Sequence, residues 1–306
     1  MCWPRRLLCA GLLILSGAWP GAPHAEEPSC KPLVPSKPLA AARIEHGHGL
    51  LWRITGATGG DSFLFGSMHV DDPRVMRVLA QVDAQFNASS TFALEVVIDQ
   101  AATQKLGAAM FYSDGQRLSA VAGETLFQAA TQRLANYGIP PPLAEAIKPW
   151  AAFITLSMPA SGNAEPLDLH LMAAATKAGK RVLGLETIEE QIGVFESISA
   201  TEQLDMLREA VCNYTIFQQE LQEMVEAYVA RDLAALMQQS LRYASPEKDA
   251  FMDKLLWQRN ARMAARMTPL LEAGHAFITV GALHLPGERG ILHLLEQRGY
   301  RVEALY

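Results

Sequence analysis

The sequence predicts an α/β protein with a central β-sheet core built from two strand-GxxH-helix-strand halves and a large helical insertion between them. In the first half, the apolar run 63–65 leads into Gly66-Ser67-Met68-His69, and a helix begins after Asp72. In the second half, the apolar run 277–280 leads into Gly281-Ala282-Leu283-His284, and helix and strand patterns follow. Most of the chain separates the two copies, so we expect the fold to bring two distant halves together.

A β-hairpin is expected before the first motif. Leu50–Ile54 and Ser62–Phe65 are apolar, β-like runs with a glycine-rich turn between them. Asp72 is the expected N-cap of the next helix, which has proline at its first position and extends to about Phe86. The strand after that helix covers 91–98 and is apolar on both faces, which predicts burial on both sides of the sheet.

The middle of the chain is mostly helical in pattern. After the strand predicted at 91–98 comes a long helical pattern, with interruptions at a glycine and at a run of three prolines. A helix is expected over 167–178, and a short strand over 181–185 places Glu186 at its C-terminal end. Residues 200–267 are almost wholly helical, with apolar side chains three and four positions apart. The chain ends in a last predicted strand at 300–305.

The N-terminus has the composition of a secretory signal. Arg5 and Arg6 form a short positive region, and the apolar stretch 7–19 is shorter than the roughly 20 residues that span a bilayer. We expect a signal peptide at 1–25 and one α/β domain at 26–306, in a periplasmic or secreted protein without a stable membrane anchor in the mature chain. The formal charge of −6 argues against nucleic acid as a partner. The sequence does not predict an oligomeric state.

Two cysteines, Cys30 and Cys212, remain after the predicted signal peptide. A disulfide between them would persist in an oxidising compartment. The alternative is two free thiols, and the sequence alone does not decide between these possibilities.

His69 and His284 are candidate metal ligands. Each follows the end of a predicted buried strand, which is where open α/β sheets bind ligands. The glycine three residues before each histidine lets the backbone turn sharply. A hydrogen bond to a loop carbonyl would explain either histidine alone, but two copies in the same context favour a shared site.

Glu95 is the third candidate ligand, because it falls in a strand that is predicted to be buried on both faces. A carboxylate there is costly unless it is paired or binds a metal. Pairing with Arg259 or Lys148 is the alternative explanation. Two neutral imidazoles and a carboxylate suit Zn, Mn, Fe or Co, and an open coordination position would allow the metal to activate water.

Glu186 also ends a predicted strand. It would act as a general base, orient a metal ligand, or serve only as the first-turn acid of the next helix, and these three possibilities stay open. The sequence has no G-x-S-x-G, H-E-x-x-H, phosphate-loop or G-x-G-x-x-G pattern.

Short stretches spread over nearly all of the chain beyond the signal carry a family resemblance: Leu64-Phe65-Gly66-Ser67-Met68-His69-Val70, Ala93-Leu94-Glu95, Lys148-Pro149-Trp150, Gly184-Leu185-Glu186-Thr187, Glu190-Gln191, Arg259-Asn260 and Val280-Gly281-Ala282-Leu283-His284-Leu285. In these stretches the chain resembles the TraB/GumN family, which includes the Tiki proteases. The resemblance implies an α/β fold related to erythromycin esterase and to the haem-binding ChaN proteins. For Tiki members it implies a metal-dependent protease with paired GxxH histidines and a glutamate at the active site.

The resemblance places the metal ligands at His69, Glu95 and His284. We expect an exported metal-dependent hydrolase that cleaves a peptide or protein bond with metal-activated water, the metal being Mn, Co or Zn. Glu95, Glu186 and Arg259 are the expected catalytic residues, and Arg259 would stabilise the oxyanion. The alternatives are a metal-independent His/Glu hydrolase of the esterase type, or a peptide-pheromone- or haem-binding protein without catalysis.

Overall fold

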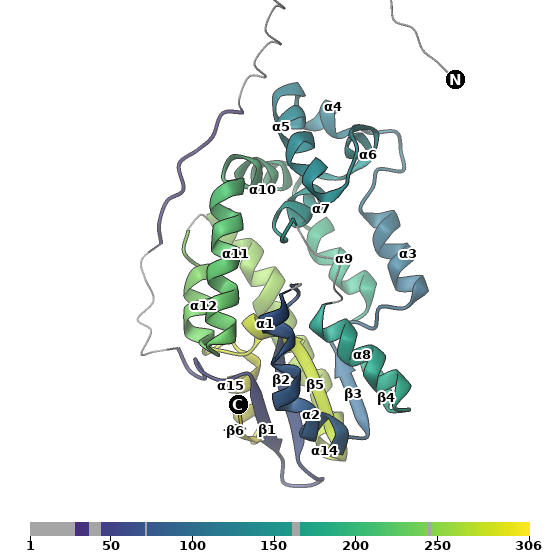
Figure 1. Ribbon diagram of the computed structural model, residues 1–306, viewed down its shortest axis with the longest axis vertical. Helices are drawn as coiled ribbons and strands as arrows, with labels where there is room; N and C mark the ends of the chain where they lie inside the picture. Colours follow the sequence, from purple (N-terminus) through teal and green to yellow (C-terminus); the bar gives the residue numbers. More distant parts are fainter. Residues whose placement is uncertain (1–27, 37–43, 71, 161–165, 244–245) are drawn as a thin grey trace, which may run out of the picture.

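The computed structural model describes residues 28–36, 44–70, 72–160, 166–243 and 246–306. The predicted signal peptide, residues 1–25, lies outside this part of the chain. A six-stranded sheet occupies one end of the molecule, and most of the helices extend beyond it toward the other end (Figure 1). Within the described ranges, no helix has the length and apolar composition needed to cross a membrane.

The sheet has the strand order β4-β3-β5-β2-β1-β6. The central pairs β2–β5, β5–β3 and β3–β4 are parallel, whereas β1 pairs antiparallel with β2 and with β6. The strands are β1 Leu51–Thr55, β2 Ser62–Ser67, β3 Thr91–Leu94, β4 Arg181–Gly184, β5 Ala276–Gly281 and β6 Arg301–Ala304. The predicted α/β class and the predicted hairpin are confirmed, and the strands that carry the two GxxH motifs, β2 and β5, are direct neighbours.

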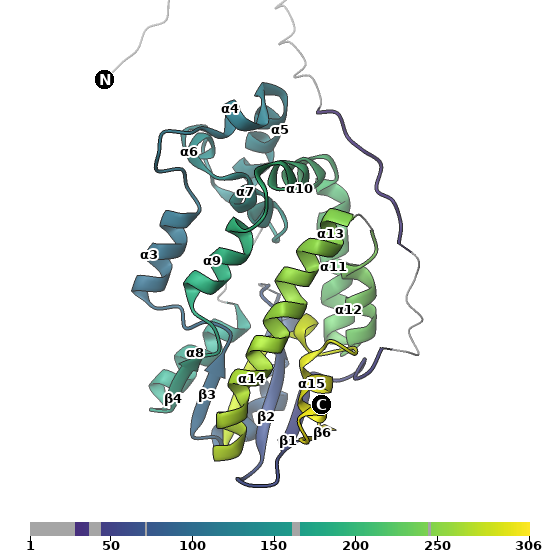
Figure 2. The same cartoon turned by 180° about the vertical axis from the view of Figure 1, so that it is seen from behind.

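Helices cover both faces of the sheet and form the insertion. Two helices, α2 and α8, lie on one face, and α14 lies on the other (Figures 1 and 2). The helical elements are α1 Pro73–Met76, α2 Leu79–Ala88, α3 Gln100–Ala109, α4 Leu118–Ala122, α5 Glu124–Leu134, α6 Pro141–Ala146, α7 Pro149–Leu156, α8 Leu167–Lys177, α9 Ile188–Glu196, α10 Ala200–Cys212, α11 Tyr214–Val229, α12 Leu233–Ser240, α13 Pro246–Met252, α14 Gln258–Ala273 and α15 Ile291–Gln297. Short 3₁₀ turns cover Ala135–Tyr137 and Ala282–His284, and a π-helical segment, Asp253–Trp257, joins α13 to α14.

Aromatic side chains fix the packing of the three central strands. The ring of Phe277 on β5 lies 6.1 Å from Phe65 on β2 and 6.3 Å from Phe92 on β3, measured between ring centroids. Phe86 of α2 covers Phe277 from above the sheet at 5.5 Å. Burial of each ring contributes about 1.5–3 kcal/mol. This cluster holds β2, β5 and β3 in a fixed register, so the residues that follow these strands emerge side by side.

One predicted helix is divided, and one predicted strand ends early. The helix predicted from residue 73 to about 86 is divided into α1 and α2, because Val78 N–H bonds to the Val75 carbonyl in a tighter turn. The strand predicted over 91–98 ends at Leu94, where the chain bends and Glu95 leaves the sheet. At this bend the Glu186 N–H donates to the Glu95 carbonyl at 2.7 Å, which holds the two strand ends together.

Cys30 and Cys212 form a disulfide, with their Cα atoms 5.7 Å apart. The bond fastens the extended N-terminal segment 28–36 to the end of α10. Of the two possibilities that the sequence left open for these cysteines, the structure shows the bridged one.

Candidate active site

Three neighbouring parallel strands deliver the candidate ligands to one edge of the sheet. Glu95 follows β3, His284 lies in the 3₁₀ turn after β5, and His69 lies two residues beyond β2. Because β5 lies between β3 and β2, these three side chains start from adjacent positions at the carboxyl ends of the strands. This edge is where ligands bind in open α/β sheets.

The three side chains meet at Gly281. A methyl group added to the Gly281 Cα would lie 3.3 Å from Glu95 Oε1, 3.5 Å from His284 Cδ2 and 3.9 Å from His69 Nε2. Glu95 Oε1 also accepts a hydrogen bond from the Gly281 N–H at 2.6 Å and lies 3.6 Å from His284 Nε2. Glycine at this position therefore leaves the space into which the three groups point. The structure brings together all three residues that the sequence singled out.

Each imidazole is held through its Nδ1 atom by a side-chain oxygen. His69 Nδ1 lies 2.9 Å from Asp168 Oδ1, and His284 Nδ1 lies 2.5 Å from Asn260 Oδ1. The Asn260 amide nitrogen donates to the Arg289 carbonyl, so its oxygen faces the imidazole and accepts the Nδ1 proton. Such outer partners orient metal-binding histidines and leave Nε2 available.

Asp168 and Asn260 are site residues that residue-by-residue reasoning missed. Asp168 lies in the first turn of α8, and Asn260 lies in α14, beside Arg259. Only the family resemblance contained a signal for Asn260, through the Arg259-Asn260 pair. Asp168 occupies an ordinary position for a first-turn acid, and nothing in the chain near it points to His69.

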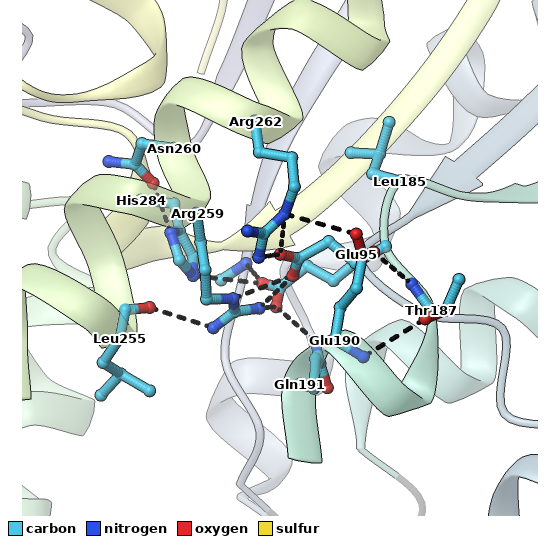
Figure 3. Close-up of polar contacts among 12 residues, drawn as sticks. Glu95, Leu185, Thr187, Glu190, Gln191, Leu255, Arg259, Asn260, Arg262 and His284 are labelled. Carbon is cyan, nitrogen blue, oxygen red and sulfur yellow. Dashed lines mark hydrogen bonds and ion pairs between the residues drawn. The ribbon is translucent and has the colours of Figure 1, made fainter. Parts of the chain in front are cut away.

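A buried arginine, Arg259, connects Glu95 to Glu186. Figure 3 shows Arg259 within the network of polar contacts around Glu95. Arg259 Nη2 lies 2.5 Å from Glu95 Oε2 and 2.7 Å from Glu186 Oε2, and Arg259 Nε donates to the same Glu186 oxygen at 2.9 Å. Arg262 donates to the other Glu186 oxygen at 2.5 Å. Both oxygens of Glu186 are thus held by arginines, and Arg259 lies between Glu186 and Glu95. Lys148, the other partner considered for Glu95, pairs with Glu196 instead.

Helix α9 begins immediately after Glu186 and supports this network. Thr187 and Glu190 form a capping box, in which each side chain bonds to the backbone N–H of the other. The next residue, Gln191, donates from its side chain to Glu95 Oε2 at 3.3 Å. The β4–α9 connection therefore positions Glu186 and contributes a third polar contact to Glu95.

The environment sets different charges on the three central residues. Burial would raise the pKa of Glu95, but the charges of His284, Arg259 and His69 and the Gly281 N–H lower it to about 2. Burial, together with the nearby charge of Arg259, lowers the pKa of His284 to about 4 despite the attraction of Glu95. His284 is therefore neutral near pH 7, and Arg259 is the permanent cation that keeps Glu95 ionised.

His69 differs from His284 in exposure and charge. Its side chain is 48% exposed, whereas that of His284 is 5% exposed, so His69 faces the open side of the site. Partial burial disfavours the charged ring, but the hydrogen bond and charge of Asp168, with the charge of Glu95, raise the pKa of His69 to about 9. At neutral pH the protein alone therefore carries one charged and one neutral imidazole at the site.

The donor atoms around Gly281 match a divalent metal only in part. Within the described ranges, no group of three or more His, Cys, Asp or Glu side chains is gathered closely enough to hold a metal ion. Glu95 instead turns one oxygen to the Gly281 N–H and the other to Arg259. In chemical type the residues fit a metal, because two imidazoles held at Nδ1 and one carboxylate lie around Gly281.

Comparison with known proteins decides the family. The model of the TraB/PrgY/gumN family matches residues 50–304, a range that contains all of the site residues described above. The chain belongs to the TraB/PrgY/gumN family. It is also similar to the protein named Metalloprotease TIKI2 from Danio rerio, with 25% identity over 164 residues.

The similarity to the Danio rerio protein is partial. It covers 45% of this chain and 32% of the relative, so the chain matches about a third of that protein's length. The comparison with solved structures finds no match. The predicted family is thus confirmed. The similarity to a protein named a metalloprotease is a hint of hydrolase or protease chemistry.

Proposed function

We propose that this TraB/PrgY/gumN protein is an exported, metal-dependent hydrolase that cleaves a peptide or protein bond. The observation that carries the proposal is the convergence of His69, Glu95 and His284 at Gly281, with each imidazole held at Nδ1 by a side-chain oxygen. Family membership and the similarity to a metalloprotease support the same reaction class. The disulfide supports an oxidising compartment.

In this proposal His69, Glu95 and His284 hold the metal, which is Mn, Co or Zn. The chemistry that a divalent metal supplies in such a site is activation of water and polarisation of a carbonyl. Asp168 and Asn260 hold the rings at Nδ1, with Nε2 of His69 on the side of Gly281 and Nε2 of His284 3.6 Å from Glu95 Oε1. Binding a metal requires His69 to release its proton and Glu95 to turn an oxygen away from its present partners.

Arg259 has a positioning role in this account. Its Nε and Nη2 atoms contact the two glutamates, and Nη1 donates to the Leu255 carbonyl at 3.1 Å. Glu186 in turn fixes Arg259, since both of its oxygens are engaged by arginines. We therefore propose that Glu186 and Arg259 act through Glu95, rather than as a general base and an oxyanion donor.

The protonation states favour this proposal over metal-independent catalysis by a histidine base. An efficient general base has a pKa near the working pH. The pKa of His284 is lowered to about 4 by its burial, which makes it a weak base. The pKa of His69 is raised to about 9, mainly by Asp168, and His69 is protonated near pH 7.

A turnover assay with controlled metal content tests the proposal. Residues 26–306, purified without chelators, are assayed against a peptide library after chelation and after addition of Mn, Co or Zn. We expect cleavage that is lost on chelation and restored by one of these metals. Cleavage that persists unchanged after chelation would support a metal-independent hydrolase. Saturable peptide binding without cleavage under every metal condition would support a capture protein.

A further inference from the structure

A cavity separate from the Gly281 site lies between the N-terminal segment 31–34 and helices α10, α11 and α13. Its volume is about 420 Å³, which falls in the range of small-molecule sites. Helix α13 runs close to α10 and α11, and the N-terminal segment passes along their outer side (Figure 2). The apolar side chains that line the cavity include Leu33, Phe153, Phe217, Leu221, Met224 and Phe251. None of the residues that meet at Gly281 contributes to this lining.

The N-terminal segment is a fastened wall of the cavity. At one end the Cys30–Cys212 disulfide ties it to α10, and Cys212 itself lines the cavity. At the other end the Ser36 N–H donates to the Arg242 carbonyl at 2.8 Å, and Pro35 forms a β-bridge with Tyr243. Because both ends are held, the segment forms a fixed wall on the outer side of the cavity, and the cavity volume suits a small molecule. A protein partner would need an open surface.

The charged side chains of the lining are mainly acidic: Glu202, Asp205, Glu209 and Glu220, against Lys31 and Arg208. Three of the acids are already engaged within the protein. Asp205 and Glu220 pair with arginines, and Glu202 accepts the Ser199 N–H at the start of α10. Glu209 is half-buried, and its carboxylate has no hydrogen bond or ion pair within the described ranges. Lys31 also has no hydrogen bond or ion pair within these ranges, but it is exposed to solvent. The half-buried Glu209 is therefore the charge that a molecule inside the cavity would meet.

We propose that this cavity binds a small amphiphile with an apolar chain and a single cationic end. The apolar chain lies among the phenylalanine, leucine and methionine side chains of α7, α11 and α13. The unbranched, polarisable side chain of Met224 adapts to a flexible chain more readily than a branched residue would. The cationic end lies at Glu209. The inference does not depend on the proposed hydrolase activity.

Calorimetric titration with two probes of equal chain length tests the proposal. Residues 26–306 with the disulfide intact are titrated with decyltrimethylammonium and with decyl sulfate, both below their critical micelle concentrations. We expect one saturable site per chain for the ammonium, with an affinity at least about fivefold higher than for the sulfate. No saturable binding, or equal affinity for the two probes, would overturn the proposal.

Substitutions in the lining locate the binding site. Met224→Trp should fill the cavity and abolish ammonium binding, whereas Met224→Leu should retain it. Glu209→Gln should remove the preference for the ammonium over the sulfate. The part of the affinity that comes from the apolar chain should remain. Circular dichroism confirms that each variant is folded. Ammonium binding that survives Met224→Trp in a folded protein would contradict this location.

His284→Ala should bind the ammonium normally. This control separates a failure of this proposal from a failure of the proposed function.

Discussion

The Gly281 N–H and Glu95 Oε1 form a hydrogen bond of 2.6 Å that joins the ends of β5 and β3. Two consequences follow for the site. Glu95 is fixed as an ionised carboxylate although it is buried, and the Cα of Gly281 faces a small space bordered by Glu95, His69 and His284. A single backbone position therefore adds to the stabilisation of the Glu95 charge and also sets the room at the centre of the site.

Gly281→Ala should remove activity and metal binding without unfolding the protein. The backbone φ of Gly281 is −54°, which alanine adopts without strain, so the effect comes from the added methyl group. That group would lie 3.3 Å from Glu95 Oε1 and 3.5 Å from the His284 ring. Gly107→Ala in α3 is the matched control, because a methyl group there meets nothing within 4 Å. Turnover and metal content are measured for both, and normal metal binding by Gly281→Ala would contradict the placement of the site.

Arg259→Ala should be strongly destabilising. It leaves the carboxylates of Glu95 and Glu186 buried without their shared cation, and breaking a buried ion pair typically costs about 3–5 kcal/mol. The free energy of unfolding is measured by urea denaturation. Lys105→Ala, which removes a surface pair with Glu189, is the control and should have little effect. Equal stability of Arg259→Ala and wild type would show that the network is not structural.

The Glu190–Arg266 pair should make stability dependent on pH in the acid range. Two hydrogen bonds, of 2.7 and 2.8 Å, link the side chains, and Arg266 lowers the pKa of Glu190 from 4.5 to about 2. A carboxylate with a lowered pKa in the folded state stabilises above its unfolded pKa, and this stabilisation is lost as the pH falls toward the folded value.

We therefore expect wild type to be more stable than Glu190→Gln by about 1 kcal/mol at pH 7, a value reduced for partial solvent exposure. The difference should shrink between about pH 4.5 and pH 2. Urea denaturation of both proteins across this range checks the prediction. A difference that grows as the pH falls would contradict the assigned sign.

Cys30→Ser should lower stability under oxidising conditions. The disulfide joins residues 182 positions apart, and removing a native disulfide typically costs about 2–5 kcal/mol. Reduction of wild type should lower its stability to a similar extent and should not affect Cys30→Ser. Thiol labelling under denaturing, non-reducing conditions should find no free cysteine in exported wild type. Labelling of both Cys30 and Cys212 would contradict a native bridge.

The sequence predicted the core of this arrangement because strand patterns and repeated motifs are local signals. The two GxxH motifs each combine an apolar run, a glycine and a histidine, and the parallel pairing of β2 with β5 brings them together. Glu95 was identified from its apolar surroundings. Its position beyond the end of β3 was not predicted, because the bend depends on contact with the β4–α9 connection.

The partners of the site residues were harder to predict. Asp168 reaches His69 across 99 positions of the chain, and this contact depends on how α8 packs on the sheet. The sequence predicts Glu186 at the end of a strand, and β4 ends two residues before it, at Gly184. The arginines that occupy the Glu186 oxygens come from α14 and are not predicted. Side-chain pairs of this kind have no periodic pattern in the sequence, so only the folded chain shows them.

The most direct test of the central claim is the metal content of single-site variants. His69→Ala, Glu95→Gln and His284→Ala are purified without chelators, loaded with Mn, Co or Zn, and compared with wild type by elemental analysis. His293→Ala is the control, because His293 pairs with Glu45 at 2.5 Å, away from Gly281. We predict one metal ion per chain in wild type and in His293→Ala, and a large loss in each of the other three. Full metal occupancy in folded His284→Ala would contradict the claim that the two GxxH histidines share one metal.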